Sequence, residues 1–231
     1  MITHTHTIPV ITVDGPTGSG KGTVSALLAQ HFHWHLLDSG AIYRVFALAA
    51  LEENIPLSDE NALAELATGL DIQFLPQTLN DNRILLAGCD VTQEIRRESI
   101  GAEASRVSRF PLVREALLHC QRAFRRHPGL IADGRDMGTV IFPDATLKIF
   151  LFASDEVRAQ RRYEQLLSTH LSVDYEEILK ELRVRDHRDQ TRTVAPLKPA
   201  ADAYSIDSTA LSPAQVLAIV LDYYAQRMLS A

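Results

Sequence analysis

A glycine-rich segment at residues 15–23 constrains the fold of this chain more than any other part of the sequence. It reads GPTGSGKGT and satisfies the phosphate-loop pattern G-x-x-x-x-G-K. In such a loop, successive backbone N–H groups surround a phosphate, and the following helix adds its positive dipole end. Residues 8–13 form a β-branched run, and residues 22–32 have apolar side chains at helical spacing. Strand, glycine loop and helix in this order predict the first unit of a parallel α/β sheet.

The phosphate loop also predicts the groups that hold a nucleoside triphosphate. Lys21 supplies a mobile positive charge for the β- and γ-phosphates. Gly22 stands where the general pattern has Ser or Thr, so the hydroxyl is displaced to Thr23. The expected ATP-binding residues are Gly15, Pro16, Thr17, Gly18, Ser19, Gly20, Lys21, Gly22 and Thr23. The displaced ending Gly-Lys-Gly-Thr is similar to that of nucleoside monophosphate kinases.

Hydrophobic patterning continues the α/β alternation along the chain. We expect further buried strands at residues 35–37, 130–132, 147–152 and 204–206. Helices are expected at residues 41–53, 61–68, 112–126, 155–168, 175–189 and 213–228, the last with Ser212 as its N-cap and Pro213 at its first position. Short strands at residues 71–75, 83–87 and 90–92 depart from the alternation and predict an antiparallel insertion.

Composition excludes several other classes of protein. Hydrophobic residues make up 46% and charged residues 23% of the 231 residues, which is ordinary for one globular domain. No apolar run approaches a membrane span, no signal peptide is predicted, and two cysteines cannot build a disulfide framework. The net charge of −6 disfavours binding to nucleic acid or to a membrane surface. We therefore expect a cytoplasmic protein.

Polar residues after the strand at 35–37 fit an acceptor site, because ligands of open α/β sheets lie beyond the carboxyl ends of the strands. Asp38 or Ser39 would cap a helix that carries Tyr43 and Arg44. Ser39 and Tyr43 are four residues apart and share one helix face, and Arg44 is a candidate phosphate ligand. The alternative is a plain helix cap followed by a half-buried aromatic residue.

The strand at 130–132 ends in a second charged loop, Asp133-Gly134-Arg135-Asp136. A carboxylate at such a strand end is where P-loop enzymes hold a hydrated Mg²⁺, so Asp133 and the displaced Thr23 are the metal candidates, acting through water. Arg135 is a candidate phosphate ligand, and Asp136 can accept hydrogen bonds from an amine. The structural alternative is a salt-bridged turn.

Arginines recur at helical spacing in two later helices. The first set is Arg158, Arg161 and Arg162, and the second is Arg185, Arg188 and Arg192, together with Asp189. An isolated helix of this kind has a solvated face paired with acids such as Glu164 and Asp186. In a P-loop kinase the same pattern predicts a lid that brings guanidinium groups onto the phosphates and expels water. The expected catalytic set is Lys21, Arg158, Arg162 and Arg188.

Alternating histidines raise the question of a bound metal. His31, His33 and His35 would share one face of a strand, as would His4 and His6. Neither set is completed by a cysteine or carboxylate at suitable spacing, so we expect neither to bind a metal. Mg²⁺ carried by ATP is the cofactor that we expect.

Taken in order, these motifs resemble those of bacterial cytidylate (CMP) kinases. The resemblance extends over nearly the whole chain, in the segments DGPTGSGKGT (14–23), WHLLDSGAIYR (34–44), FPLVREAL (110–117), GLIADGRDMGTVIFPDA (129–145), RDHRDQTRTVAPL (185–197) and DST (207–209). It implies an α/β fold with a parallel-sheet P-loop kinase core at residues 8–38, 115–154 and 193–231. A helical NMP-binding subdomain at 39–114 would carry a small antiparallel β insertion at about 70–95, and an arginine-rich helical lid would occupy 155–192.

The resemblance also implies roles for the acceptor residues. Arg44 and Arg135 would hold the CMP phosphate beside Tyr43. Ser39, Arg114, Asp136 and Arg192 would read the cytosine ring, and Ser105, Arg185 and Asp189 would surround the ribose. The segment 194–203 would pack against the adenine of ATP. The implied reaction is a reversible, direct in-line transfer of the γ-phosphate of MgATP to CMP or dCMP, and we expect a monomer.

Three other functions compete with this interpretation. The nearest is a sister kinase that uses UMP, AMP or a small acid such as shikimate. A P-loop regulator that binds nucleotide to control a partner is a second, although the guanine-reading N-K-x-D sequence of GTPase switches is absent. An RNA-binding protein that uses the arginine helices is a third, disfavoured by the net charge and by the lack of interleaved aromatic residues.

Overall fold

Five parallel strands form the central sheet of the computed structural model, which describes residues 8–78, 81–167 and 174–229. Their order across the sheet is β2-β6-β1-β7-β8, and each neighbouring pair is parallel. The strands are β1 (Val10–Asp14), β2 (His35–Asp38), β6 (Leu130–Gly134), β7 (Leu147–Phe152) and β8 (Tyr204–Asp207). The sheet confirms the predicted α/β class and each of the predicted parallel strands.

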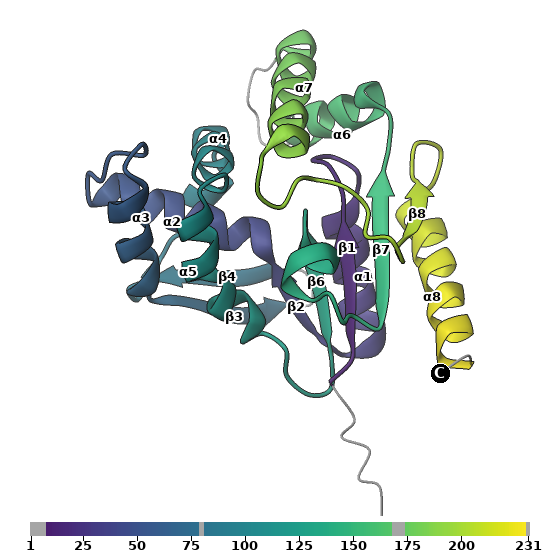
Figure 1. Cartoon of the computed structure of the whole chain (residues 1–231). Coiled ribbons are helices and arrows are strands. Elements are labelled where there is room, and N and C mark those ends of the chain that lie inside the picture. Colours follow the sequence, from purple (N-terminus) through teal and green to yellow (C-terminus); the bar gives the residue numbers. More distant parts are fainter. Residues whose placement is uncertain (1–7, 79–80, 168–173, 230–231) are drawn as a thin grey trace, which may run out of the picture.

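The central strand β1 is buried along its whole length because helices cover both faces of the sheet. On one face, Ile11 and Val13 pack with α1 (Lys21–Phe32) and α8 (Pro213–Leu229). On the other face, Val10 packs with α2 (Ser39–Glu52) and α5 (Pro111–Arg122). The carboxyl ends of the strands therefore meet at one edge, which is the upper edge in Figure 1.

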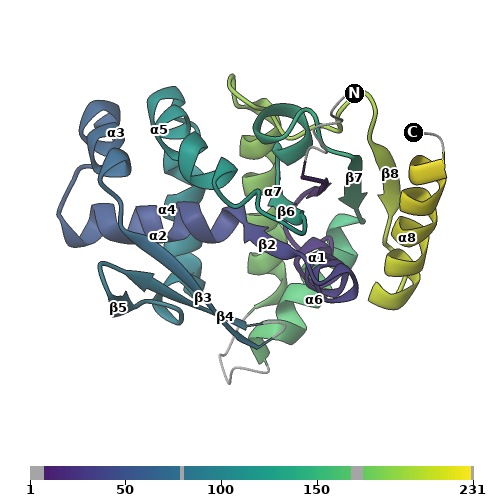
Figure 2. The same cartoon turned by 90° about the horizontal axis from the view of Figure 1, so that it is seen from below.

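A mainly helical part of the chain lies to one side of the sheet (Figures 1 and 2). It contains α2 and α5 together with α3 (Glu60–Thr68) and α4 (Glu98–Val107). A small antiparallel sheet in the order β3-β4-β5 completes it, formed by β3 (Ile72–Thr78), β4 (Asp81–Leu86) and β5 (Cys89–Asp90). Ile84 and Leu86 of β4 pack against α2. The predicted antiparallel insertion is thus confirmed.

Two helices, α6 (Asp155–Leu167) and α7 (Tyr175–Thr191), lie above the carboxyl ends of the central strands (Figure 1). A small core of Ala159, Leu166, Ile178 and Leu179 holds them together. The helix predicted at 155–168 ends at Leu167, and Ser168 lies outside the described residues. Residues 1–7, with His4 and His6, also lie outside them.

Three elements were absent from the sequence prediction: a short 3₁₀ turn, η1 (Glu94–Arg96), helix α4 and a π-helical turn. Helix α4 buries Ile100, Gly101, Ala104, Ser105 and Val107, and three of these five side chains are small, so few large apolar residues mark the helix in the sequence. A single π-helical turn, Met137–Ile141, follows β6. That turn depends on a side chain of β1, which is distant in sequence, so no local pattern could predict it.

The helix caps locate two residues near the sheet edge. Asp38, rather than Ser39, caps α2, since its Oδ1 accepts from Ala41 N at 3.0 Å. Ser39 is therefore the first residue of α2, and its side chain serves another purpose. Ser212 accepts from Gln215 N at 3.3 Å, as predicted for the start of α8.

The histidines of residues 31–35 do not form a common strand face. His31 belongs to the last turn of α1, His33 ends that helix in a left-handed conformation with φ of 54°, and His35 begins β2. Over the described ranges, no helix is both long and apolar enough to span a membrane.

Candidate active site

The phosphate loop joins β1 to α1, and its backbone requires glycine. Gly15, Gly18 and Gly20 have φ values of 154°, 77° and 89°, which residues with side chains rarely adopt. A Cβ atom on Gly15 would lie 2.0 Å from the carbonyl oxygen of Leu151 in β7. Glycine therefore allows the loop to curl tightly against the sheet, as a phosphate cradle requires.

Lys21, the first residue of α1, folds back over this loop. Its Nζ donates to Pro16 O at 3.2 Å and lies 4.0 Å from Asp133 Oδ1 at the end of β6. Burial lowers the pKa of Lys21 to about 8, and the nearby charge of Arg135 adds to the effect. Burial raises the pKa of Asp133 to about 6, against the opposing charge of Lys21. A polyanion that binds beside Lys21 would raise this pKa again, because it stabilises the charged form.

The two metal candidates lie beside the first turn of α1. A Cβ atom on Gly22 would be 3.6 Å from Asp133 Oδ2, so this glycine leaves space next to the carboxylate. Thr23 is exposed at the following position. Within the described residues, no group of three or more His, Cys, Asp or Glu side chains could hold a metal. One carboxylate and one hydroxyl instead suit an ion such as Mg²⁺, which keeps several waters and binds substrate phosphates.

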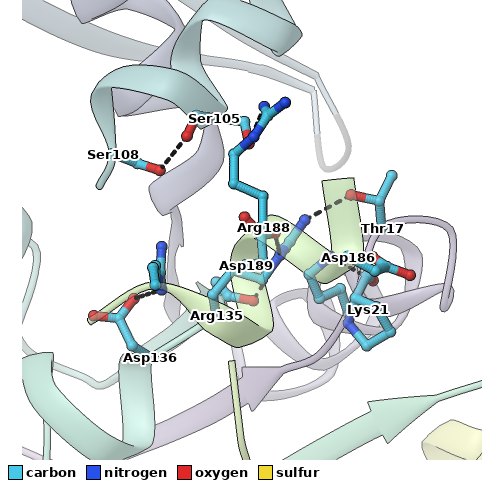
Figure 3. Close-up of polar contacts among 12 residues, drawn as sticks. Thr17, Lys21, Ser105, Ser108, Arg135, Asp136, Asp186, Arg188 and Asp189 are labelled. Carbon is cyan, nitrogen blue, oxygen red and sulfur yellow. Dashed lines mark hydrogen bonds and ion pairs between the residues drawn. The ribbon is translucent and has the colours of Figure 1, made fainter. Parts of the chain in front are cut away.

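Arg135 links the phosphate loop to α7. Its Nη2 donates to Thr17 Oγ1 at 2.7 Å, and its Nε donates to Asp189 Oδ2 at 3.1 Å (Figure 3). Both contacts are to side chains that are distant in sequence. The guanidinium group therefore lies between the donor loop and the arginine-rich helix.

Arg44 of α2 and Arg185 of α7 lie together against α4. A Cβ atom on Gly101 would come within 3.3 Å of Arg44 Nη2 and 3.8 Å of Arg185 Nη1. Burial lowers the pKa of Arg185 to about 10, and the charge of Arg135 contributes. Burial also lowers the pKa of Arg44. Cationic groups that are held together in this way, without full neutralisation, favour binding of an anion such as phosphate.

A pocket beside these arginines collects every predicted acceptor residue except Arg44. Its lining includes Ser39, Tyr43, Ser105, Arg114, Arg135, Asp136, Arg185, Asp189 and Arg192. They come from α2, α4, α5, the loop after β6, and α7 with its C-cap. Arg44 lies at the margin, where Nη1 donates to Ile95 O at 2.9 Å.

Asp136 forms the centre of a buried charge cluster in this pocket. Its Oδ2 accepts from Arg114 Nη2, and its Oδ1 lies 3.7 Å from Arg192 Nη2. Arg114 Nη1 donates to Ser108 O at 3.0 Å. The side chains of Asp136, Arg114 and Arg192 are 5%, 7% and 6% exposed. A carboxylate can accept about four hydrogen bonds, so Asp136 retains acceptor capacity next to strong donors.

Tyr43 completes one wall of the pocket. The guanidinium carbon of Arg114 lies 5.8 Å from the centre of its ring. Burial raises the pKa of the Tyr43 hydroxyl to about 12, so the hydroxyl remains a proton donor at neutral pH. Among the described residues its oxygen has no partner at ordinary hydrogen-bond distance, although the nearby Gln121 side chain opposes the rise in pKa.

Arg158 connects α6 to both the phosphate loop and α7. Its Nη1 donates to Thr17 O at 2.9 Å and pairs with Asp186 at 2.6 Å, and the side chain is 3% exposed. Its guanidinium group is thus engaged by the protein itself. The predicted catalytic contact of Arg158 with phosphate would require these partners to be exchanged.

The other two predicted catalytic arginines, Arg162 and Arg188, contact residues of α4. Arg162 pairs with Glu98 of α4, and burial lowers its pKa, with Arg44 contributing. Arg188 donates to Ser105 Oγ at 3.2 Å (Figure 3). Both contacts join the arginine-rich helices to α4 across the site.

Ser208, which follows β8, contacts the phosphate loop, and Arg161 of α6 contacts Ser208. Ser208 donates from Oγ to Ser19 O at 2.8 Å, and Arg161 Nη2 donates to Ser208 O at 2.7 Å. These two residues, which were not among the predicted site residues, support the phosphate loop from outside. Leu197, in the segment predicted to contact adenine, lines a cavity with Pro16.

Comparison with known proteins identifies the family. A family model described as cytidylate kinase matches residues 11–226. The chain belongs to the cytidylate kinase family. Membership confirms the resemblance indicated by the motifs, and with it the kinase class of the chain.

Several cytidylate kinases are similar to this chain along its length. The one from Aeromonas salmonicida (strain A449) is 56% identical over 220 residues, covering 95% of each chain. That from Erwinia tasmaniensis is 54% identical over 224 residues, covering 97% of this chain and 98% of the relative. That from Salmonella choleraesuis (strain SC-B67) is 56% identical, covering 95% and 96%.

Asp14 is a further residue beside the site that the sequence analysis did not predict. Asp14 ends β1 and accepts from Met137 N and Gly138 N, each at 2.8 Å. It thereby fixes the π-helical turn directly after Asp136. Burial raises the pKa of Asp14 to about 7, although the two backbone hydrogen bonds oppose the shift. A carboxylate at the end of a fully buried strand is the sequence signal that could have identified it.

Asp14 predicts a specific pH dependence of stability. Its folded pKa lies above its unfolded value, so the folded state holds more protons between pH 4 and 7, and its contribution to stability falls as pH rises. Relative to Asp14→Asn, the free energy of unfolding of the unliganded wild type should therefore drop by about 2 kcal/mol between pH 5 and pH 7. Urea denaturation of both proteins measures the difference. A constant difference would contradict the raised pKa.

Proposed function

We propose that this protein transfers the γ-phosphate of ATP to CMP or dCMP, giving ADP with CDP or dCDP. The observation that carries the proposal is the buried Asp136, held between Arg114 and Arg192 in a pocket that Arg135 and Arg185 also line. This arrangement provides an acceptor for an amine and donors for its neighbours. Arg135 of the same pocket donates to Thr17 of the phosphate loop, which also carries Lys21.

The base-reading end of the pocket suits cytosine. Cytosine has an amino donor beside the acceptors N3 and O2, whereas uracil reverses the first two of these positions. Asp136 and Ser39 would accept from the amine, while Arg114 and Arg192 would donate to the ring acceptors. Uracil would leave the Asp136 carboxylate facing a carbonyl oxygen, and buried polar groups without partners discriminate strongly.

The phosphate and ribose would occupy the arginine side of the pocket. Arg44 and Arg135 would hold the CMP phosphate, with Tyr43 beside it. Ser105, Arg185 and Asp189 would surround the ribose. The base contacts do not involve the sugar, so dCMP keeps every one of them and is expected to be a substrate, although a less good one than CMP if the ribose contacts contribute to binding.

Transfer would be direct and in line. An acceptor phosphate oxygen is already anionic, so no general base is required, and catalysis rests on positioning and charge neutralisation. Lys21, Arg162 and Arg188 would neutralise the equatorial oxygens, with Arg158 joining them if its present contacts are exchanged. Asp133 and Thr23 would hold Mg²⁺ through water, and this ion would supply further charge neutralisation at the phosphates.

Closure of the moving parts is included in the proposal. The NMP-binding subdomain at 39–114 and the lid at 155–192 would close over the core at 8–38, 115–154 and 193–231. Closure would exclude the water that would otherwise hydrolyse ATP. We expect the protein to work as a monomer in the cytoplasm, where two unpaired cysteines are usual.

Acceptor-dependent ADP formation tests the proposal. With MgATP present, the rate should be highest with CMP and dCMP, lower with UMP and AMP, and lowest without an acceptor. Equal rates with and without CMP would refute the kinase activity. Preference for UMP or AMP would instead establish a sister specificity and refute the assignment of the base-reading residues.

A further inference from the structure

A buried hydrogen bond behind the pocket involves the serine that lines the base-reading end. Ser39 Oγ donates to Gln121 Oε1 at 2.8 Å. Ser39 lines the pocket, whereas Gln121 lies behind it and is completely buried. Gln121 is seven residues after Arg114 in α5, so both side chains project from the same face of that helix. One face of α5 therefore affects the base-reading end at two positions, directly through Arg114 and indirectly through the contact of Gln121 with Ser39.

The orientation of the Gln121 amide follows from its second contact. Its Nε2 donates to Leu117 O at 3.4 Å. A carbonyl oxygen can only accept, so the amide nitrogen must face Leu117 and the amide oxygen must face Ser39. That oxygen is also only an acceptor, which means that Ser39 has to supply the proton of their hydrogen bond.

This contact determines what Ser39 can offer a ligand. A serine hydroxyl has one proton and two lone pairs. Once the proton is directed to Gln121, only the lone pairs remain for a group in the pocket. In the proposed binding mode, in which the amine of the base faces Ser39 and Asp136, both residues present acceptors to it, and neither can donate to a carbonyl oxygen placed there.

We propose that Gln121 is a specificity-determining positioning residue that keeps Ser39 a hydrogen-bond acceptor, so that the pocket favours an amine over a carbonyl at this position of the pyrimidine. The inference rests on the proposed function, because it requires the base of the acceptor nucleotide to lie against Ser39. Gln121 acts through Ser39, its hydrogen-bond partner, and is not part of the pocket lining.

Replacement of Gln121 by methionine removes the acceptor while retaining the length and approximate volume of the side chain. The Ser39 hydroxyl is then free to turn its proton toward O4 of uracil. We expect the ratio of kcat/KM for CMP to that for UMP to fall about tenfold in Gln121→Met, which corresponds to one hydrogen bond of ordinary strength. The KM for ATP should stay within about twofold of wild type.

Gln121→Glu is the matched control. Its carboxyl group still presents an acceptor oxygen to Ser39, and burial beside Leu117 O favours a protonated form that donates to that carbonyl. The CMP/UMP ratio should therefore stay within about twofold of wild type. A loss of selectivity in Gln121→Glu equal to that in Gln121→Met would overturn the proposal, because general disturbance of the core would then explain both.

A double-mutant cycle separates the role of Gln121 from that of its partner. In a Ser39→Ala background, Gln121→Met should leave the CMP/UMP ratio unchanged, since no hydroxyl remains to be oriented. An equal fall in both backgrounds would refute the coupling. If Ser39→Ala alone left the ratio unchanged, the base would not contact Ser39, and the base-site assignment itself would fail along with this inference.

Gln121→Asn provides a second route to the same comparison if the methionine variant does not fold. It shortens the side chain and withdraws the acceptor from Ser39 while retaining an amide in the core. The expected result is again a lower CMP/UMP ratio, and wild-type selectivity in a folded Gln121→Asn protein would overturn the proposal.

Discussion

Replacement of Lys21 by methionine is expected to lower kcat for CMP phosphorylation by about 10³-fold. Charge develops on the oxygens of the transferred phosphoryl group, and Lys21 is the mobile cation of the phosphate loop. Its depressed pKa of about 8 in the unliganded protein reflects burial without full compensation, which bound phosphates would provide. Steady-state kinetics with saturating MgATP and CMP measure the effect.

The matched control for Lys21→Met is Lys180→Met. Lys180 is exposed in α7, so removal of its charge should leave kcat within about twofold of wild type. A thermal unfolding curve establishes that both variants are folded. If Lys21→Met retained kcat within about threefold of the wild-type value, the loop lysine would have no part in the transfer step.

Replacement of Asp136 by asparagine is expected to lower the CMP/UMP ratio of kcat/KM by about 10³-fold. Arg114 and Arg192 would attract the amide oxygen, because both are donors. The amide nitrogen would then face the base, where it can donate to the O4 of uracil but not accept from the amine of cytosine. Kinetics with each nucleotide at fixed MgATP measure the ratio, and the KM for ATP should change little.

Asp144→Asn is the control for the same chemical change. Asp144 pairs with Arg125 at 2.7 Å, and its side chain is 60% exposed. Exposed ion pairs contribute little to stability, so kcat/KM for CMP and kcat/KM for UMP should both stay near their wild-type values. Unchanged selectivity in a folded Asp136→Asn protein would remove Asp136 from the base-reading role.

Much of the fold was predictable because its signals are local. The phosphate loop, the parallel strands and the arginine spacings each lie within a short stretch of sequence, and the structure has strands and helices at the predicted places. The pocket residues also come together, although their roles as ligands stay predictions. The motifs follow successive parallel strands, and side chains at the carboxyl ends of neighbouring strands must lie near one another. The sequence could therefore predict which residues share the pocket.

The rest depended on contacts between distant residues. Asp14 fixes the turn at Met137 across more than a hundred positions of sequence, and Gln121 contacts Ser39 from a different helix. The position of Asp14 at the end of a buried strand marks it as unusual but does not indicate its partner, and Gln121 has no local pattern that separates it from an ordinary helix position. For Arg158 the sequence predicts a role that the contacts do not show. Its spacing predicts a phosphate ligand, whereas its guanidinium group contacts Thr17 and Asp186.

The segment from the end of β6 to Asp136 restricts how such a site can diverge. Within four positions, Asp133 lies beside Lys21, Arg135 contacts the phosphate loop, and Asp136 contacts Arg114. Insertion or deletion of one residue would displace the donor half from the acceptor half by about 3.3 Å, the rise of one strand residue. New acceptor preferences are therefore expected to arise by substitution in α4 and α5, with the length of this segment unchanged.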